Sequence, residues 1–329
     1  MFDRIWLKYK QHRFETVAVA VLCLIATAGS LFEAWRLYSV GVPASCLVDG
    51  RVPYWYGGSG PMDACQLASL RFTGIVDGWD IRMVEQIGQL LPFVAGIVIG
   101  APLVAGEIEQ GTAPLSWALA GSRWKWLAGK LAAALVLIVP LLLAAGLAAD
   151  VLQGAATPGI DSHASMYNLT SRGVFFPLWG VATLLGTVAL GALKARTLPV
   201  VLMALVVCLL ARATWDPLMN AYVLHGMAVL EMPGVNSSGE LLVYQSSVLY
   251  LDGKVYTGTA CVLTGGMTMC QYDQSTEPEP MTGGPQQGWY VVTGDHYWPV
   301  VALESAIMLA GSVVFGAFAF FWVGRRRPY

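Results

Sequence analysis

Six long apolar runs, separated by polar stretches, dominate the pattern of this chain. The runs cover residues 17–32 with their flanks, 84–105, 131–149, 174–193, 197–213 and 298–323. A helix needs about 20 predominantly apolar residues to cross the hydrocarbon core of a bilayer. The pattern therefore predicts an all-α membrane protein with six transmembrane helices.

The polar stretches divide the chain further. Residues 1–15 mix basic and aromatic side chains, which is typical either of an amphipathic helix at the membrane interface or of a plain basic flank. Residues 16–213 hold the first five helices, an external loop at 40–82 and a cytoplasmic loop at 106–123. Residues 298–329 hold the sixth helix and a basic cytoplasmic tail.

The longest polar stretch, residues 214–297, carries eight acidic residues against the single Lys254. This charge places it outside the cell as a small extracellular domain. Alternating residues around Ser247–Tyr250, followed by the turn residues Asp252 and Gly253, predict a β-hairpin in it. The fold class is thus a helical membrane bundle with a small mixed or β segment between helices five and six.

Composition and charge agree with this picture. Of the 329 residues, 56% are hydrophobic and 12% charged, where soluble domains average about 25% charged. The net charge of −2 gives no signature of nucleic-acid binding. Because basic residues favour the cytoplasmic side, both termini and the 106–123 loop are expected in the cytoplasm of a multi-pass plasma-membrane protein. The basic residues that set this orientation are Arg4, Lys8, Lys10, Arg13, Arg123, Lys125, Lys130, Lys194, Arg196, Arg325, Arg326 and Arg327.

Six cysteines fit the same topology. Cys23 and Cys208 lie within apolar runs and should be free. Cys46 and Cys65 bracket the first external loop, and Cys261 and Cys270 lie in the second, where an oxidising compartment permits disulfides. We expect the bridges Cys46–Cys65 and Cys261–Cys270, although other pairings stay open because sequence does not fix connectivity.

Catalytic chemistry is not indicated by the sequence. It has no G-x-x-x-x-G-K-[ST] phosphate loop, and its four histidines are scattered, so we expect neither nucleotide hydrolysis nor a metal site in this chain. The cores of the predicted helices hold no ionisable residue; Glu304 comes nearest, as an interfacial carboxylate or as an outer gate that faces substrate. Such cores disfavour proton- or sodium-coupled transport and suit an amphiphilic or apolar cargo.

Glycine and proline mark close packing in the second helix. Gly96 and Gly100 form a small-x-x-x-small step that lets another backbone approach. Pro92 and Pro102 each remove a helical hydrogen bond and should bend the helix.

The loop at 106–123, which we call the elbow, breaks the most apolar part of the chain with charge. Glu107 and Glu109 are two residues apart and so point to different sides, one toward a partner and one toward Arg123 or Lys125. Gly111 can end the turn with a positive φ.

A short helix at 113–120 should follow, with Thr112 as its N-cap and Pro114 in its first turn. Three tryptophans, Trp117, Trp124 and Trp126, should anchor this helix at the lipid headgroups. The elbow is therefore either a surface that receives force from a soluble partner or an ordinary interfacial loop.

The elbow also carries a family resemblance. Gly100–Ala105, Glu107, Glu109, Gly111 and Thr112, followed by Ser122–Lys130, resemble the permease subunits of ABC-2 type transporters, especially actinobacterial ones. Trp6 with Gln11–Arg13, and Tyr297–Pro299 with Glu304 and the end of the sixth helix, are similar to the same family.

This resemblance implies a six-helix permease of the type V exporter kind. Its elbow would couple to a separate ATP-binding subunit through Glu107, Glu109, Gly111, Thr112 and Arg123. ATP and Mg²⁺ would bind to that ATPase, and no cofactor would bind to this chain. A second permease copy or a paralogue would complete the transporter.

The function expected is the transmembrane subunit of an ATP-driven exporter for an amphiphilic small molecule, antibiotic or lipid-like compound. The alternative is a non-conducting signalling or assembly subunit whose external domain, residues 214–297, recruits a cell-envelope partner. A membrane-embedded enzyme is the least favoured reading, because no acid–base or nucleophile–base pair is found.

Overall fold

The computed structural model describes residues 13–47, 52, 62–158, 169–231, 246–251, 254–256, 261–264, 267–270, 286–292 and 297–325. The chain divides into two compact units. Residues 1–162, 168–215 and 299–329 form the first, helical unit, and residues 163–167 with 216–298 form the second unit. The predicted interfacial helix at 1–15 and the arginines after Arg325 lie almost wholly outside the described residues.

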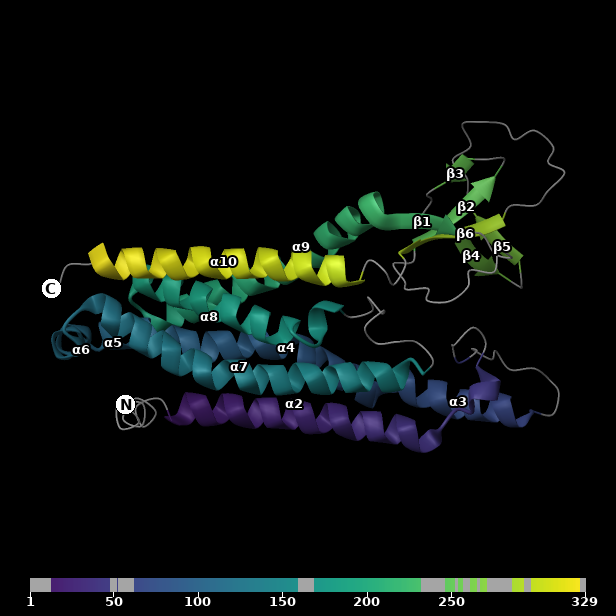
Figure 1. The fold of residues 1–329 in the computed structure, drawn as a ribbon, viewed down its shortest axis with the longest axis horizontal. Helices are drawn as coiled ribbons and strands as arrows, with labels where there is room; N and C mark the ends of the chain where they lie inside the picture. The colour runs from purple at the N-terminus through teal and green to yellow at the C-terminus, as the bar shows by residue number, and fades with distance from the viewer. Residues whose placement is uncertain are drawn as a thin grey trace. The chain divides into compact units, whose positions relative to one another are not determined.

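Helices make up the described part of the first unit (Figure 1). In chain order they are α2 (Arg13–Val40), the 3₁₀ turn η1 (Ala44–Cys46), α3 (Ala64–Val76), α4 (Trp79–Ala101), the π-helical turn η2 (Pro102–Gly106), α5 (Glu107–Glu109), α6 (Ala113–Ala120), α7 (Arg123–Ala156), the 3₁₀ turn η4 (Leu169–Ser171), α8 (Phe175–Lys194), α9 (Thr197–Met227) and α10 (Tyr297–Arg325). The last residues of α9 and the first two of α10 belong to the second unit.

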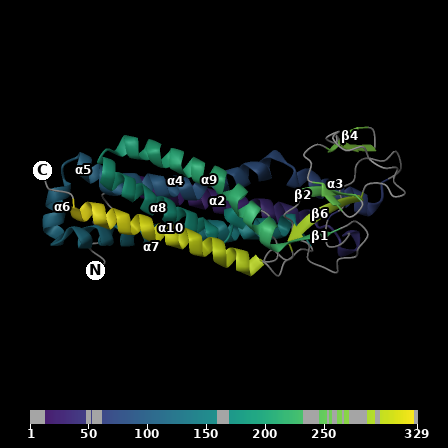
Figure 2. The ribbon, with the colours of Figure 1, turned by 90° about the horizontal axis from the view of Figure 1, so that it is seen from above.

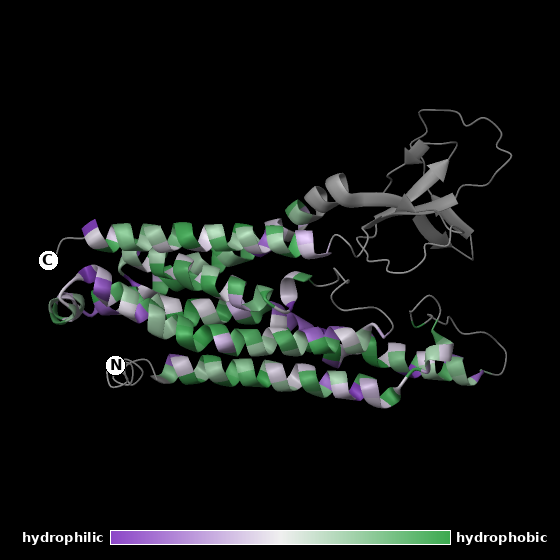
Figure 3. Ribbon diagram, in the orientation of Figure 1, coloured by the Kyte–Doolittle hydropathy of each residue, from purple (hydrophilic) through white to green (hydrophobic). Residues whose placement is uncertain are grey.

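Six helices in the described ranges are long and apolar enough to cross a membrane, which confirms the predicted number of spans. They are α2, α4 with its continuation through η2 and α5, α7, α8, α9 and α10. Figure 3 shows the apolar residues running along these helices. The chain is thus a multi-pass membrane protein.

The core of the bundle forms where α4 lies against α8 and where α2 lies against α7. The predicted packing glycines Gly96 and Gly100 both face α8. A Cβ atom added at Gly96 would lie 2.7 Å from the Cβ of Thr183, and one added at Gly100 would lie 3.0 Å from the carbonyl oxygen of Leu184. Only a hydrogen in place of a side chain allows the two backbones to come this close.

The two ends of the bundle differ in what they carry. Figures 1 and 2 both place α5, α6, the start of α2 and the end of α10 together at one end, and α3 at the other. The start of α9 lies at the first end too, because its backbone bonds to α5. The elbow and both described chain ends therefore share one side of the bundle.

The loop expected at 40–82 is in large part helical, so that prediction is wrong for its second half. It contains α3, and α4 begins within it. Asp63 and Gln66 form a capping box: Gln66 N donates to Asp63 Oδ1 at 2.7 Å, and Asp63 N donates to Gln66 Oε1 at 3.1 Å. This pairing three residues apart is a helix-start signal that sequence analysis overlooked.

A disulfide joins Cys46 to Cys65, with their Cα atoms 5.2 Å apart, which confirms the predicted pairing. The bond ties η1 to the first turn of α3. Cys23 and Cys208 are free, as expected.

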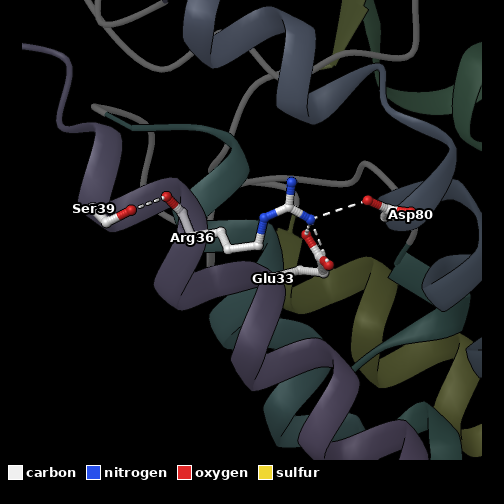
Figure 4. Close-up of polar contacts among 4 residues, drawn as sticks. All are labelled: Glu33, Arg36, Ser39 and Asp80. Carbon is white, nitrogen blue, oxygen red and sulfur yellow. Dashed lines mark hydrogen bonds and ion pairs between the residues drawn. The ribbon is translucent and has the colours of Figure 1, made fainter.

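An ionic cluster joins α2 to the start of α4 at the α3 end of the bundle (Figure 4). Arg36 Nη1 lies 2.8 Å from Glu33 Oε2 and 3.1 Å from Asp80 Oδ2. Ser39 Oγ donates a hydrogen bond to the carbonyl oxygen of Arg36 at 2.6 Å. Glu33 and Arg36 are three residues apart on α2, and Asp80 adds a long-range contact to this pair.

The described part of the second unit contains two antiparallel sheets. Their strands are β1 (Ala228–Glu231), β2 (Ser246–Leu251), β3 (Lys254–Tyr256), β4 (Cys261–Thr264), β5 (Met267–Cys270) and β6 (Gln286–Val292). The first sheet has the order β1-β6-β2-β3, and β4 pairs with β5 alone. β2 pairs with β3 in antiparallel fashion, whereas the turn expected at 252–253 lies outside the described residues. The β4–β5 ladder sets Cys261 directly opposite Cys270.

Candidate functional site

The elbow consists of the short helix α5, a turn and the helix α6, and a glycine follows each helix. α4 runs without a break through η2 into α5, which ends at Glu109. Gly111 has φ of +69° and Gly121 has φ of +71°, a backbone region that side chains with a Cβ rarely adopt. The first glycine ends α5, as expected, and the second ends α6 before α7 begins.

Glu107 does not face a partner. Its side chain is only 4% exposed and forms an ion pair with Lys130 of α7, which is 6% exposed. The ammonium group of Lys130 also donates a hydrogen bond to the carbonyl oxygen of Leu103 at 2.9 Å. The prediction that Glu107 points outward or toward Arg123 or Lys125 is therefore wrong, because a buried cation on the next helix attracts it.

Glu109 lies on the exposed side and contacts the start of α9. Its Oε2 atom accepts hydrogen bonds from the backbone N–H and from the hydroxyl of Thr197, both at 2.8 Å. Neither glutamate contacts Arg123 or Lys125 in these bonds. The two carboxylates instead attach the elbow to two different helices, α7 and α9.

One face of α6 is buried and the other is open. Ala113 and Trp117 pack into the core of the bundle, whereas Leu115 and Leu119 are 66% and 81% exposed. The rings of Trp117 and Trp126 pack edge to face with their centres 6.0 Å apart, and both are buried. The prediction that these two tryptophans anchor the helix at the headgroups is therefore wrong. Trp124 alone of the three is exposed.

Arg123 and Thr112 form further side-chain contacts of the elbow. The guanidinium of Arg123 lies 4.7 Å from the ring centre of Trp117, and Nη1 donates to the carbonyl oxygen of Gly324 at 3.3 Å. Thr112 precedes α6 as expected but does not cap it; its hydroxyl donates to the carbonyl oxygen of Glu107 at 3.3 Å. Arg123, the first residue of α7, thereby links α6 to the end of α10.

Lys130 and Thr197 belong to the elbow site but were not predicted from the sequence. Lys130 is set among apolar residues just before the predicted third span, and α7 begins at Arg123, so the lysine lies within the helix. A lone lysine between Leu127 and Leu131 was the available signal, since an ionisable residue in an apolar run needs a partner. Nothing local in the sequence pairs Thr197 with Glu109.

Glu304 is 3% exposed on α10, so it is buried within the protein, and its expected role as an outer gate stays a prediction. Another ionisable residue, Arg172, is buried just outside the predicted fourth span. Arg172 is 3% exposed and lies 3.8 Å from Asp150. It lines, with Glu85, Gln89 and Gln153 and with several apolar residues, a cavity of about 30 Å³, room for about one water. In the ranges covered by the structure, no three His, Cys, Asp or Glu residues are grouped to hold a metal.

A larger cavity, of about 400 Å³, lies among α4, α8, α9 and α10. Its walls are almost wholly apolar and aromatic. The described structure thus offers an exposed elbow at one end and an apolar cavity along the helices.

The fold and the elbow define a polytopic membrane protein whose second and third spans are joined by a short helix with an open face. A family model described as "ABC-2 membrane transporter related" matches residues 14–219. The chain belongs to this family, and it is accordingly a membrane component of the ABC transporter type, as the sequence resemblance implied. No curated protein and no solved structure matches the chain.

Proposed function

We propose that the chain is the permease subunit of an ATP-driven exporter for an amphiphilic small molecule, antibiotic or lipid-like compound. The elbow is the surface on which a separate ATPase docks, and it faces the cytoplasm together with both chain termini. Two permease copies, or two paralogues, and two ATPases form the working unit, and ATP and Mg²⁺ bind the ATPases. The strands of the second unit then lie outside the cell.

One observation carries this proposal: α6 is buried on one side and apolar and exposed on the other. Leu115 and Leu119 stand out from the end of the bundle. Next to them lie the exposed Glu109, Thr112 and Lys125. An apolar centre with a polar rim is the usual anatomy of a protein interface.

The internal bonds of the elbow support a role in force transmission. Glu107 fixes α5 to α7 through Lys130, and Glu109 fixes α5 to the first residue of α9. A push on α6 therefore reaches two membrane helices through polar bonds rather than through a flexible loop.

The test is co-purification with a co-expressed ABC ATPase. Substituting Leu115→Glu together with Leu119→Glu should reduce the retained ATPase at least tenfold, because the change places charge in an apolar contact. The matched control is Leu67→Glu on α3, a half-exposed leucine at the opposite end of the bundle. Wild-type retention of the ATPase by the elbow variant would overturn the docking proposal.

A second function, a non-conducting subunit that recruits a cell-envelope partner, is favoured by the second unit. That unit is compact in itself and has its own four-stranded sheet. Deleting residues 228–292 separates the two functions. Lost partner binding with intact export would make the unit a recruiting module of an exporter, and failure of the complete complex to export any candidate compound would favour the signalling role.

A further inference from the structure

We infer that the apolar cavity among α4, α8, α9 and α10 binds one extended hydrocarbon chain. The ligand class is a long alkyl or acyl chain, supplied either by a membrane lipid or by the tail of an amphiphilic cargo. The assignment to cargo rests on the proposed export function, whereas the binding of the chain does not.

The lining decides the chemistry. None of the residues that line the cavity carries a charge, and its polar side-chain groups are the hydroxyls of Thr183 and Thr187, the Cys208 thiol and the indole N–H of Trp179. The thiol already contacts the Thr183 hydroxyl, with Sγ and Oγ1 3.9 Å apart. The rest of the wall is apolar, so the cavity favours hydrocarbon over water.

The dimensions decide the shape of the ligand. The volume of about 400 Å³ falls in the usual range for small-molecule sites. The cavity is bordered along α8 from Trp179 to Leu193, a stretch of about 21 Å at a rise of 1.5 Å per residue. A long, narrow apolar space accommodates an extended chain better than a compact ring system.

Small residues on α8 create this space. Ala182, Gly186 and Ala189 border the cavity opposite α9 and α10. A Cβ atom added at Gly186 would lie 3.7 Å from the ring of Phe315, so the site has room for a larger side chain there. A leucine at this position would extend beyond that Cβ atom and take up part of the cavity volume.

An aromatic wall closes the end of the cavity away from the elbow. Trp179 lies 5.0 Å from Phe93 and 5.3 Å from Trp215 between ring centres. This wall would block a hydrocarbon chain that lies along α8. The polar end of such a ligand would therefore lie away from Trp179.

The experiment uses the full-length protein in phosphatidylcholine nanodiscs. Two photoreactive probes are compared: a phosphatidylcholine with a diazirine in one tail, and a diazirine-bearing dodecylphosphocholine, which has the same headgroup and a single chain. Labelled residues are mapped by mass spectrometry. We expect labelling of the α8, α9 and α10 walls to exceed that of Val136, an exposed residue of α7, at least fivefold.

Two leucine variants form the matched pair. Gly186→Leu should lower the labelling of the walls at least fivefold. Gly311→Leu adds the same side chain to α10 at a position where a Cβ would meet nothing within 4 Å, and it should leave the labelling unchanged. The rate of Cys208 alkylation by N-ethylmaleimide gives a second readout, with the buried Cys23 as reference. Dodecylphosphocholine should slow this alkylation at least threefold in the wild type and should not slow it in Gly186→Leu.

Each outcome bears on the inference. Wall labelling by the phosphatidylcholine probe that dodecylphosphocholine does not displace supports a bound lipid chain, and displacement supports a single-chain amphiphile. Even labelling of all lipid-facing helices that Gly186→Leu does not change would overturn the inference, as would cross-links showing a second copy seated in the cavity. No ATPase takes part, so this failure is distinct from failure of docking at the elbow.

Discussion

The helices α4 and α8 are closely packed in the bundle, whereas the similarly apolar helices α9 and α10 are largely exposed. In the most apolar stretch of α4 and of α8, 61% of the residues are buried, against 11% in α9 and 28% in α10. Gly96 and Gly100 bring the first pair into backbone contact, whereas bulky leucines, valines and phenylalanines of the second pair face outward. Because lipid is as apolar as leucine, hydrophobicity alone does not hold membrane helices together, and close fit does.

This contrast indicates that α4 and α8 are held rigidly, whereas α9 and α10 can move. A tightly fitted pair keeps its geometry because any shift opens voids or clashes. A loosely fitted pair can change its position at small cost, and a ligand or a second subunit can lie against it. We therefore expect the packed pair to tolerate substitution poorly and the open pair to tolerate it well.

The largest effect is expected for Gly96→Leu. A Cβ there would lie 2.8 Å from the backbone nitrogen of Leu184 as well as against Thr183, and neither backbone can yield easily. Overpacking typically costs about 1–3 kcal/mol and occasionally more, and a clash with backbone makes this one of the larger cases, so we expect its loss to exceed those of the variants below. Thermal unfolding in detergent should show the loss, with Gly311→Leu as the control that stays near wild type. A Gly96→Leu protein as stable as the control would contradict the packing described here.

Lys130→Met comes next and tests the elbow end of the packed core. Removing one partner of a buried ion pair costs about 3–5 kcal/mol, because Glu107 is left charged in an apolar site. The double variant Lys130→Met with Glu107→Gln should recover most of that stability. A thermal-unfolding cycle over the two single variants and the double variant measures the coupling. Additive effects would mean that the two side chains do not act as a pair.

A matched pair of leucines gives the sharpest comparison and includes the smallest effect. Leu184 of α8 is fully buried, and Leu209 of α9 is 54% exposed. Leu184→Ala should cost about 2–5 kcal/mol through the cavity it leaves. Leu209→Ala should change stability by about 0.5 kcal/mol or less. Equal losses in the unfolding midpoint would show that α9 is packed as tightly as α8.

The fold could be predicted from the sequence where the signal is a long apolar run. All six spans were found in this way, and Gly111 and the Cys46–Cys65 bridge followed from local rules. The helix α3 was missed because its mean apolarity is modest and its neighbours are glycine and proline. Its Asp63–Gln66 capping box was the overlooked signal.

The candidate site was predictable in position but not in detail. The charge break located the elbow and its short helix correctly. Which way each glutamate points depends on residues 23 and 88 positions away, Lys130 and Thr197. Contacts over such separations follow from how whole helices pack, which no local pattern contains.

The π-helical turn η2 determines which way the elbow faces. A π-helix holds one residue more per turn than an α-helix, so it acts as a one-residue insertion. Without it, every residue beyond Gly106 would be rotated by about 100° around the helix axis, the angle that one residue subtends. Glu107 would then turn away from Lys130, Glu109 from Thr197, and the open face of α6 would point in another direction. The direction in which the proposed docking surface faces therefore depends on the number of residues before it. A deletion of one residue between Pro102 and Gly106 would preserve every side chain of the elbow and still turn all of them in another direction.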